Sequence, residues 1–368
     1  MTDNLESFDK LKIIGSTNTQ TRRLGYLVQM CNLLGDQYLS FSELQDRIED
    51  WAEKNNTFLK NHISNKGILR SSIQALASKR YIELAQALQL VTEISGYLRL
   101  TKTGRVLLAL DKETSTDEND PFKLKNKILL LLIYQILSLD SDYFIPILEL
   151  TVTYHTQKQI LENAQPHLLE HFRTLETQTS SMLLLSEAQG RIEQIQHWTK
   201  PVKYLEHLIM PRLHWLLDLE LLDWTSFQKS NEFIPSVTGS FLINLAPTVN
   251  NQRIITQSWC QNSLFSVWAE SLALQTTPWN QVAESHQKFI IQEYIRIGFD
   301  KFRTMQYQRI SAYQLILFSL LSLLFDKNIL VGFEDLKIAL SKFASVGEPR
   351  WEFSWFAIDD DGYIILPR

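Results

Sequence analysis

The chain has 368 residues, of which 45% are hydrophobic and 21% are charged, so it is long enough for two or three folded domains. Its 36 basic and 41 acidic side chains give a net charge of -5, which excludes a chain that is basic throughout. Two cysteines, Cys31 and Cys260, exclude a disulfide scaffold and any Cys-rich zinc module, and they are typical of a reducing compartment.

No targeting or membrane-spanning segment is expected. The N-terminal stretch is polar and lacks the apolar core of a signal peptide. The longest apolar stretches, 128–137 and 315–325, are shorter than the roughly 18–20 residues that a bilayer span requires. We therefore expect both to be buried core helices, and the protein to be cytoplasmic and not bound to a membrane.

Only 12 glycines and 10 prolines interrupt the chain, which favours helices. Three segments combine alternating apolar residues with a turn sequence and predict two-stranded hairpins: 88–101, 221–238 and 351–367. The expected fold is therefore mainly α with short β-hairpins, in the α+β class.

The segment before the first hairpin predicts three helices. Residues 22–35 have helical spacing and end at Gly35, a natural C-cap. Ser40 or Ser42 is the expected N-cap of a helix over 41–54, and a third helix is expected over 64–84. Three helices followed by a hairpin is the order of a winged helix-turn-helix module.

The end of this module carries a more specific signal. In YLRLTKTGRVLLAL (97–110) a strand runs into a helix through a Thr-x-Thr-Gly junction, where a Thr is expected to cap the helix and Gly104 to relax the backbone. This segment resembles the end of a winged-helix domain. The chain is similar to the tandem winged-helix DNA-binding proteins of prokaryotes, and the resemblance covers residues 20–110 and, less fully, 125–245.

The junction recurs 135 residues later. EFIPSVTGSFLINL (232–245) aligns Thr238 with Thr103 and Gly239 with Gly104. Residues 200–224 stand where a third helix and first strand of a second unit are expected. The closing segment, 313–367, is interpreted as a possible third winged helix, so the resemblance implies two or three winged-helix units joined by helical segments.

These patterns divide the chain into four parts. We expect an N-terminal winged-helix domain over 1–110, an acidic linker over 111–120 that contains five carboxylates, a second winged-helix-like domain over 121–246, and a helical C-terminal domain over 247–368 that ends in a hairpin. Residues 254–312 are rich in tryptophan and expected to be helical, without a named motif.

One string suggests metal chemistry. His167 and His171 form an H-x-x-E-H sequence, in which two histidines one helical turn apart bind zinc in some metallopeptidases. A third acidic ligand at the required distance is missing, and the favoured interpretation is two polar residues on the exposed side of a helix. Asp359 to Gly362 are interpreted as a hairpin turn and not as a carboxylate metal site.

The sequence contains no phosphate-binding glycine loop and no nucleophile elbow, and we expect neither catalytic residues nor a cofactor or metal. Between Lys60 and Arg105 lie eight basic residues against Glu83 and Glu93, a local charge of +6. In a winged helix this segment spans the recognition helix and the wing. The predicted DNA-binding residues are Lys66, Arg70, Ser71, Gln74, Lys79, Arg80, Lys102, Arg105, Lys200 and Lys203.

The sequence therefore predicts a non-enzymatic protein that binds double-stranded DNA through its N-terminal winged helix. We expect it to act as a subunit of a regulatory, mobile-element or defence complex, with other subunits or a second copy as partners. The alternative is a scaffold or adaptor whose winged helices bind protein, which the net acidity favours. A zinc hydrolase using His167 and His171 is the third, remote hypothesis.

Overall fold

A computed structural model describes residues 10–15, 17–61, 69, 75–113, 120, 122–303, 308–344, 350–358 and 360–366. The protein is mainly helical, at 66%, with small antiparallel sheets and hairpins, which confirms the predicted mainly α fold. The first and third predicted hairpins are present, and the second is not. Cys31 and Cys260 are both free and buried, as expected of core thiols.

The N-terminal unit, residues 25–113, consists of helices and one three-stranded sheet. Its elements are α1 (Gly25–Leu34), β1 (Leu39–Ser40), α2 (Phe41–Lys54), α3 (Asn56–Asn61), α4 (Ala75–Ala87), β2 (Val91–Ile94), β3 (Tyr97–Leu100) and α5 (Lys102–Glu113). The antiparallel sheet has the order β1-β3-β2, with Leu39 opposite Leu98 and Val91 opposite Leu100. The last strand of the hairpin therefore lies between its neighbour and the short strand that precedes α2.

Local sequence accounts for the boundaries of these elements. Gly35, at φ +55°, ends α1 in the left-handed region where glycine has no steric penalty. Ser40 caps α2 by accepting from the Glu43 amide, and the Glu43 carboxylate accepts from the Ser40 amide in return. The predicted turn residues Ser95 and Gly96, at φ +54° and +81°, join β2 to β3.

The middle unit, residues 126–253, is helical apart from a small terminal hairpin. It contains α6 (Asn126–Thr153), α7 (Gln157–Gln178), α8 (Met182–Gln196), α9 (Pro201–Asp218), α10 (Trp224–Ser230), α11 (Val237–Leu245), β4 (Thr248–Val249) and β5 (Gln252–Arg253). Within the described chain, α6 is the one helix long and apolar enough to cross a membrane by length and composition. Its most apolar window is 89% buried inside the protein, as the prediction of a core helix requires.

The predicted second hairpin is wrong. Helix α10 occupies the position of its first arm and turn, and only an isolated bridge joins Leu222 to Pro235. Asp223 starts this helix, because its carboxylate accepts from the amides of Thr225 and Ser226 at 3.0 Å each. Asn231, at φ +56°, ends it. A good N-cap and a left-handed C-cap thus stabilise a helix where alternating apolar residues predict strands.

The remaining elements lead into a C-terminal unit, residues 284–366. They are α12 (Gln257–Asn262), α13 (Leu264–Ser271), β6 (Thr277–Pro278), the 3-10 helix η1 (Trp279–Gln281), α14 (Glu284–Phe302), β7 (Arg309–Ser311), α15 (Ala312–Lys327), β8 (Ile329–Leu330), α16 (Phe333–Phe343), β9 (Glu352–Phe356) and β10 (Asp361–Ile365). The sheet order, β7-β10-β9, matches that of the N-terminal unit. Apart from the short α3 in one unit and β8 in the other, both units run helix, strand, helix, helix, hairpin, with the last strand in the centre of the sheet.

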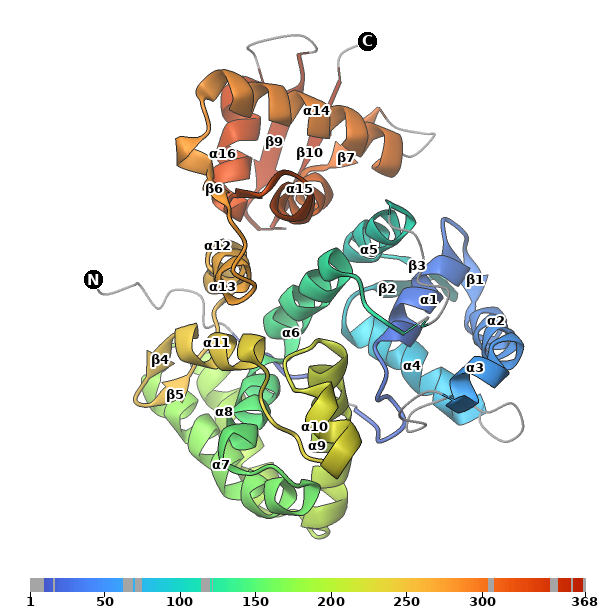
Figure 1. Cartoon of the computed structure of the whole chain (residues 1–368), viewed down its shortest axis with the longest axis vertical. Coiled ribbons are helices and arrows are strands. Elements are labelled where there is room, and N and C mark those ends of the chain that lie inside the picture. The colour runs from blue at the N-terminus through green and yellow to red at the C-terminus, as the bar shows by residue number, and fades with distance from the viewer. Residues whose placement is uncertain are drawn as a thin grey trace.

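Helix α6 connects the three units (Figure 1). It packs against α7, α9 and α11 of the middle unit, against α5 of the N-terminal unit and against α15 of the C-terminal unit. Helices α5 and α15 also pack against each other, so the two similar units are in direct contact. One continuous set of buried apolar side chains extends through all three units.

The predicted acidic linker begins inside a helix. Asp111 is part of α5, accepts from Asn32 at 2.8 Å and forms an ion pair with Lys125 at 3.1 Å. Glu113 contacts Lys127 at 3.2 Å and Lys301 at 3.1 Å. The first carboxylates of 111–120 therefore join the units, while residues 114–119 lie outside the described part of the chain.

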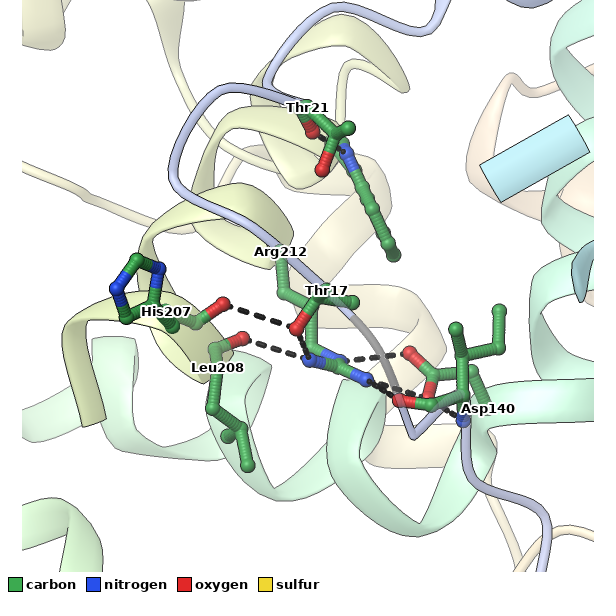
Figure 2. A network of polar contacts seen from close by, with 8 residues as sticks. Thr17, Thr21, Asp140, His207, Leu208 and Arg212 are labelled. Carbon is green, nitrogen blue, oxygen red and sulfur yellow. Dashed lines mark hydrogen bonds and ion pairs between the residues drawn. The ribbon is translucent and has the colours of Figure 1, made fainter. Parts of the chain in front are cut away.

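The described residues between 10 and 24, which we term the N-terminal strap, are held against α6 and α9 by a buried polar network (Figure 2). Arg212 and Asp140 form a fully buried, two-pronged ion pair with both N–O distances at 2.7 Å. Arg212 also donates to the carbonyl of Ile14 and to the Thr17 hydroxyl, and the Ile14 amide donates to Asp140. The N-terminal strap thus supplies hydrogen-bond partners to both the Arg212 guanidinium and the Asp140 carboxylate.

A second buried ion pair follows at the end of the strap. Arg23 Nε lies 3.1 Å from Asp218 Oδ1, and the same carboxylate accepts from the Leu24 amide at 2.7 Å. The Arg23 guanidinium lies over the rings of Phe122 and Trp224, with 4.9 and 5.6 Å to the ring centres. This cluster joins the start of α1 to the end of α9, and therefore the N-terminal unit to the middle unit.

Candidate nucleic-acid interface

The predicted recognition helix is described only in its second half. Lys66, Arg70, Ser71 and Gln74 lie outside the described residues. Lys79 and Arg80 lie on α4, where both face Glu83: Arg80 Nη1 is 2.7 Å and Lys79 Nζ is 4.0 Å from its carboxylate. One carboxylate thus offsets part of the positive charge that the sequence places on this helix.

Lys102 and Arg105 lie at the start of α5, which the sequence correctly predicts to follow the hairpin directly. The Thr101 hydroxyl accepts from the Gly104 amide at 3.0 Å and caps the helix. A Cβ atom at Gly104 would lie 2.0 Å from the Leu90 carbonyl oxygen, so the glycine permits close contact between helix and hairpin. The predicted role of Gly104 in relaxing the backbone is therefore replaced by one in packing.

The predicted repeat of this junction is present in detail. In the middle unit the Ser236 hydroxyl accepts from the Gly239 amide at 3.0 Å. A Cβ atom at Gly239 would lie 2.0 Å from the Leu221 carbonyl oxygen. The two copies therefore share a helix cap and a helix-to-backbone contact, although α10 replaces the hairpin in the second.

Lys102 and Arg105 face the C-terminal unit across a cleft, which we term the interunit cleft. It consists of two adjoining cavities of about 1260 and 580 Å³ that share Lys102, Arg105, Arg309, Gln314 and Asp361. One wall comes from β2, β3 and α5, and the other from β7, α15 and the β9–β10 hairpin. The floor includes Tyr134 and Ser138 of α6.

The described lining of the cleft is predominantly cationic. It contains five basic residues, Lys10, Arg99, Lys102, Arg105 and Arg309, and two carboxylates, Asp360 and Asp361.

Asp361 is fully engaged: it forms an ion pair with Lys102 across the cleft and accepts from the Ser311 hydroxyl and the Tyr313 amide at 2.9 Å each. Burial raises the pKa of the Asp360 carboxyl, and the hydrogen bond from Gln261 only partly opposes this. Within the described part of the chain, Arg99 and Arg105 have no carboxylate within ion-pair distance. The positive charge of Arg99 and Arg105 is therefore not offset by an ion pair among the described residues.

Lys200 and Lys203 lie apart from this cleft, at the start of α9. Both are exposed, and the ring of Tyr204 beside them stacks on Trp198 with 5.9 Å between ring centres. The predicted DNA-binding residues therefore occupy at least three separate places: α4, the interunit cleft and the start of α9.

The H-x-x-E-H string has the helical spacing that the sequence predicts but no metal-site geometry. His167 Nε2 lies 3.5 Å from Glu149, and His171 Nε2 lies 3.4 Å from Asp142. The interpretation of both histidines as exposed is wrong for His171, which is buried. Within the residues that the structure describes, no group of three or more His, Cys, Asp or Glu side chains could hold a metal ion.

Three cleft residues were absent from the predicted site. Arg99 lies on β3 inside the basic segment, and its strand position could have suggested it. Arg309 begins β7 and Lys10 belongs to the N-terminal strap. No sequence signal connects them to the site, because they come within reach of α5 only through packing between segments about 90 to 200 residues apart.

Comparison with models of known protein families gives no match for this chain, and comparison with curated proteins gives none either.

Proposed function

We propose that this protein binds double-stranded DNA through its N-terminal unit, without catalysing a reaction, and acts as a subunit of a larger assembly. The observation that carries the proposal is the architecture of this unit together with its charge. Helices α1, α2 and α4, with the short α3 between the last two, precede an antiparallel hairpin whose last strand pairs with the strand before α2, and cations follow the hairpin. This is the order of elements in a winged helix.

A winged helix would give each part of the unit a role. The helix that includes α4 would enter the major groove, and the hairpin and the start of α5 would contact flanking phosphates. Arg99 and Arg105 suit phosphate contacts because no described carboxylate lies within ion-pair distance of them. The C-terminal unit has the same sheet order and supports a second winged helix there, whereas the middle unit shares only the Gly239 junction.

The test is a fluorescence-anisotropy titration with a duplex of random sequence. The Lys66→Glu/Arg70→Glu variant is expected to abolish binding, because both residues belong to the predicted recognition helix. The matched control is Lys158→Glu/Lys229→Glu, which changes the net charge equally at two exposed positions of the middle unit. Equal binding by the wild type and the recognition-helix variant would contradict the proposed interface.

One observation favours the alternative of a protein-binding scaffold. The tip of the β2–β3 hairpin exposes Ile94 and Tyr97, and Tyr38 is exposed before β1. Apolar side chains at the tip suit a protein contact better than a phosphate contact. Failure of the wild-type protein to bind duplex DNA at low salt would favour this alternative.

A further inference from the structure

The interunit cleft differs in kind from a surface that docks a duplex. It lies between two units, and its two cavities adjoin through five shared residues. Their volumes, about 1260 and 580 Å³, together exceed the roughly 300–1000 Å³ that encloses a compact small molecule. The volume therefore suits a ligand larger than a compact small molecule.

The charges in the cleft specify an anionic ligand. Arg99, Lys102 and Arg105 lie on one wall, Arg309 on the other, and Lys10 at one end. Of the two described carboxylates, Asp361 is already held by Lys102, Ser311 and the Tyr313 amide. Cations on both walls can contact successive phosphates of one strand, because a backbone in the cleft faces both walls.

The remaining lining suits the bases. Phe302, Phe356 and Tyr363 line one end, where the Phe356 ring is half-exposed and lies 5.7 Å from that of Tyr363. Amide side chains line the cleft at Gln86, Gln89, Gln135, Gln257 and Gln314. The Ser138 hydroxyl on the floor is buried. Aromatic rings stack on any base, and amides can donate to and accept from base edges.

We propose that the interunit cleft binds a single strand of nucleic acid, with its phosphates between Arg99, Arg105 and Arg309 and its bases toward Phe356 and Tyr363. A single strand places one backbone between the two walls, where a duplex would place two. The cleft shares Arg99 and Arg105 with the proposed duplex interface, whereas Lys66 and Arg70 belong to the duplex proposal alone, so variants at those two positions separate the two proposals. The cleft proposal assigns to the C-terminal unit half of a binding site.

The test uses the full chain and fluorescein-labelled oligothymidylate and oligouridylate of about 12 nucleotides, within the usual site size of single-strand binding proteins. Binding is measured by anisotropy at several salt concentrations between about 50 and 200 mM, since phosphate contacts release counterions. The wild type is expected to bind, with unlabelled single strand competing better than duplex of equal nucleotide concentration.

Two variants separate the phosphate contacts from the stacking contacts. Arg99→Ala/Arg105→Ala is expected to weaken binding at least tenfold and to reduce the slope of log affinity against log salt by about 1.4, or about 0.7 per phosphate contact. Phe356→Ala is expected to weaken binding with the slope unchanged, because stacking releases no counterions. Lys158→Ala, at an exposed position of α7, is the control that should change neither.

Three results would overturn the proposal: no binding of either oligonucleotide at low salt, equal affinities of wild type and Arg99→Ala/Arg105→Ala, or a double variant whose salt slope equals that of the wild type. Thermal unfolding of each variant shows whether a loss of binding reflects a loss of folding. If duplex binds and single strands do not, the cleft proposal fails while the proposed duplex interface stands. If single strands bind and duplex does not, the reverse holds.

Discussion

Arg212 and Asp140 are the most deeply buried charges in the described structure, each with a side chain fully shielded from solvent. Every described hydrogen bond of this pair ends within the protein, on the N-terminal strap, on Leu208 or on the partner charge. Removal of one partner of a buried ion pair is strongly destabilising, because the remaining charge keeps its desolvation cost and loses the attraction that offset it.

Replacing Arg212 with Ala should therefore destabilise the protein by about 3–5 kcal/mol. Urea unfolding followed by circular dichroism measures this loss. The double variant Arg212→Met/Asp140→Leu should lose less than Arg212→Ala, since it removes both charges. The exposed pair Lys158–Glu162 provides the control: Lys158→Ala should cost less than about 1 kcal/mol. A loss on Arg212→Ala as small as that of the control would contradict the assigned role.

The two junction glycines make a second residue-level prediction. A methyl group at Gly104 or Gly239 would lie 2.0 Å from a backbone carbonyl oxygen, so the helix must move away from the preceding segment. Gly104→Ala and Gly239→Ala should each cost about 1–3 kcal/mol. At Gly190, in α8, a methyl group would meet nothing within 4 Å, and Gly190→Ala should instead stabilise by about 0.5–1 kcal/mol. Thermal unfolding measures the change in stability of each of the three variants. Equal changes in all three would contradict the packing role of Gly104 and Gly239.

Glu149 makes the stability depend on pH. Burial alone would raise the pKa of its carboxyl, but contacts with His167 at 3.5 Å and Arg253 at 2.5 Å outweigh burial and hold the pKa below its ordinary value of 4.5. Because the pKa is lower in the folded state, ionised Glu149 stabilises the fold above pH 4.5. This contribution is lost as the pH falls through the folded-state pKa.

The stability difference between wild type and Glu149→Gln should therefore shrink as the pH falls from about 6 to about 3. Urea unfolding at each pH gives this difference. An exposed carboxylate serves as control: Glu162→Gln, on α7, should leave a small difference that changes little with pH. A Glu149→Gln difference that grows on acidification would show the opposite sign of pKa shift.

At the scale of elements, local signals with a physical mechanism were the ones that predicted structure correctly. Gly35 ends α1, Ser40 caps α2, and Ser95-Gly96 turns the first hairpin, each through a backbone geometry that few residue types stabilise. Segment 221–238 failed because apolar alternation over a few residues does not separate a strand from a short helix. There the cap at Asp223 outweighed the pattern.

The sequence suggests a repeat between the N-terminal and middle units, but the structure shows more similarity between the N-terminal and C-terminal units. The Gly104 and Gly239 junctions share their contacts, but the elements around them differ. The closer match is between the N-terminal and C-terminal units, which share their sheet order and, apart from α3 and β8, their element order. This match depends on strands β1 and β7, which have two and three residues. Strands this short cannot show the alternation of apolar and polar residues by which a strand is predicted from sequence.

At the scale of the whole molecule, α6 and the α5–α15 contact bring together the two units that frame the interunit cleft (Figure 1). The sequence predicted Lys102 and Arg105 as binding residues from local charge, yet it could not predict the facing wall. Arg309 and Asp361 lie near α5 only because the units pack together. A local sequence pattern cannot predict contacts between residues that are about 200 to 260 positions apart. The buried strap network was missed for the same reason.

We propose that this acidic chain binds nucleic acid, with a duplex at the N-terminal unit. The most direct test is the titration of the wild-type protein with a duplex of about 30 base pairs and random sequence, at low and at high salt. Binding is expected to weaken steeply as salt increases, with a slope of log affinity against log salt of about -0.9 for each phosphate contact. Absence of binding at low salt would contradict the claim and favour a protein-binding scaffold.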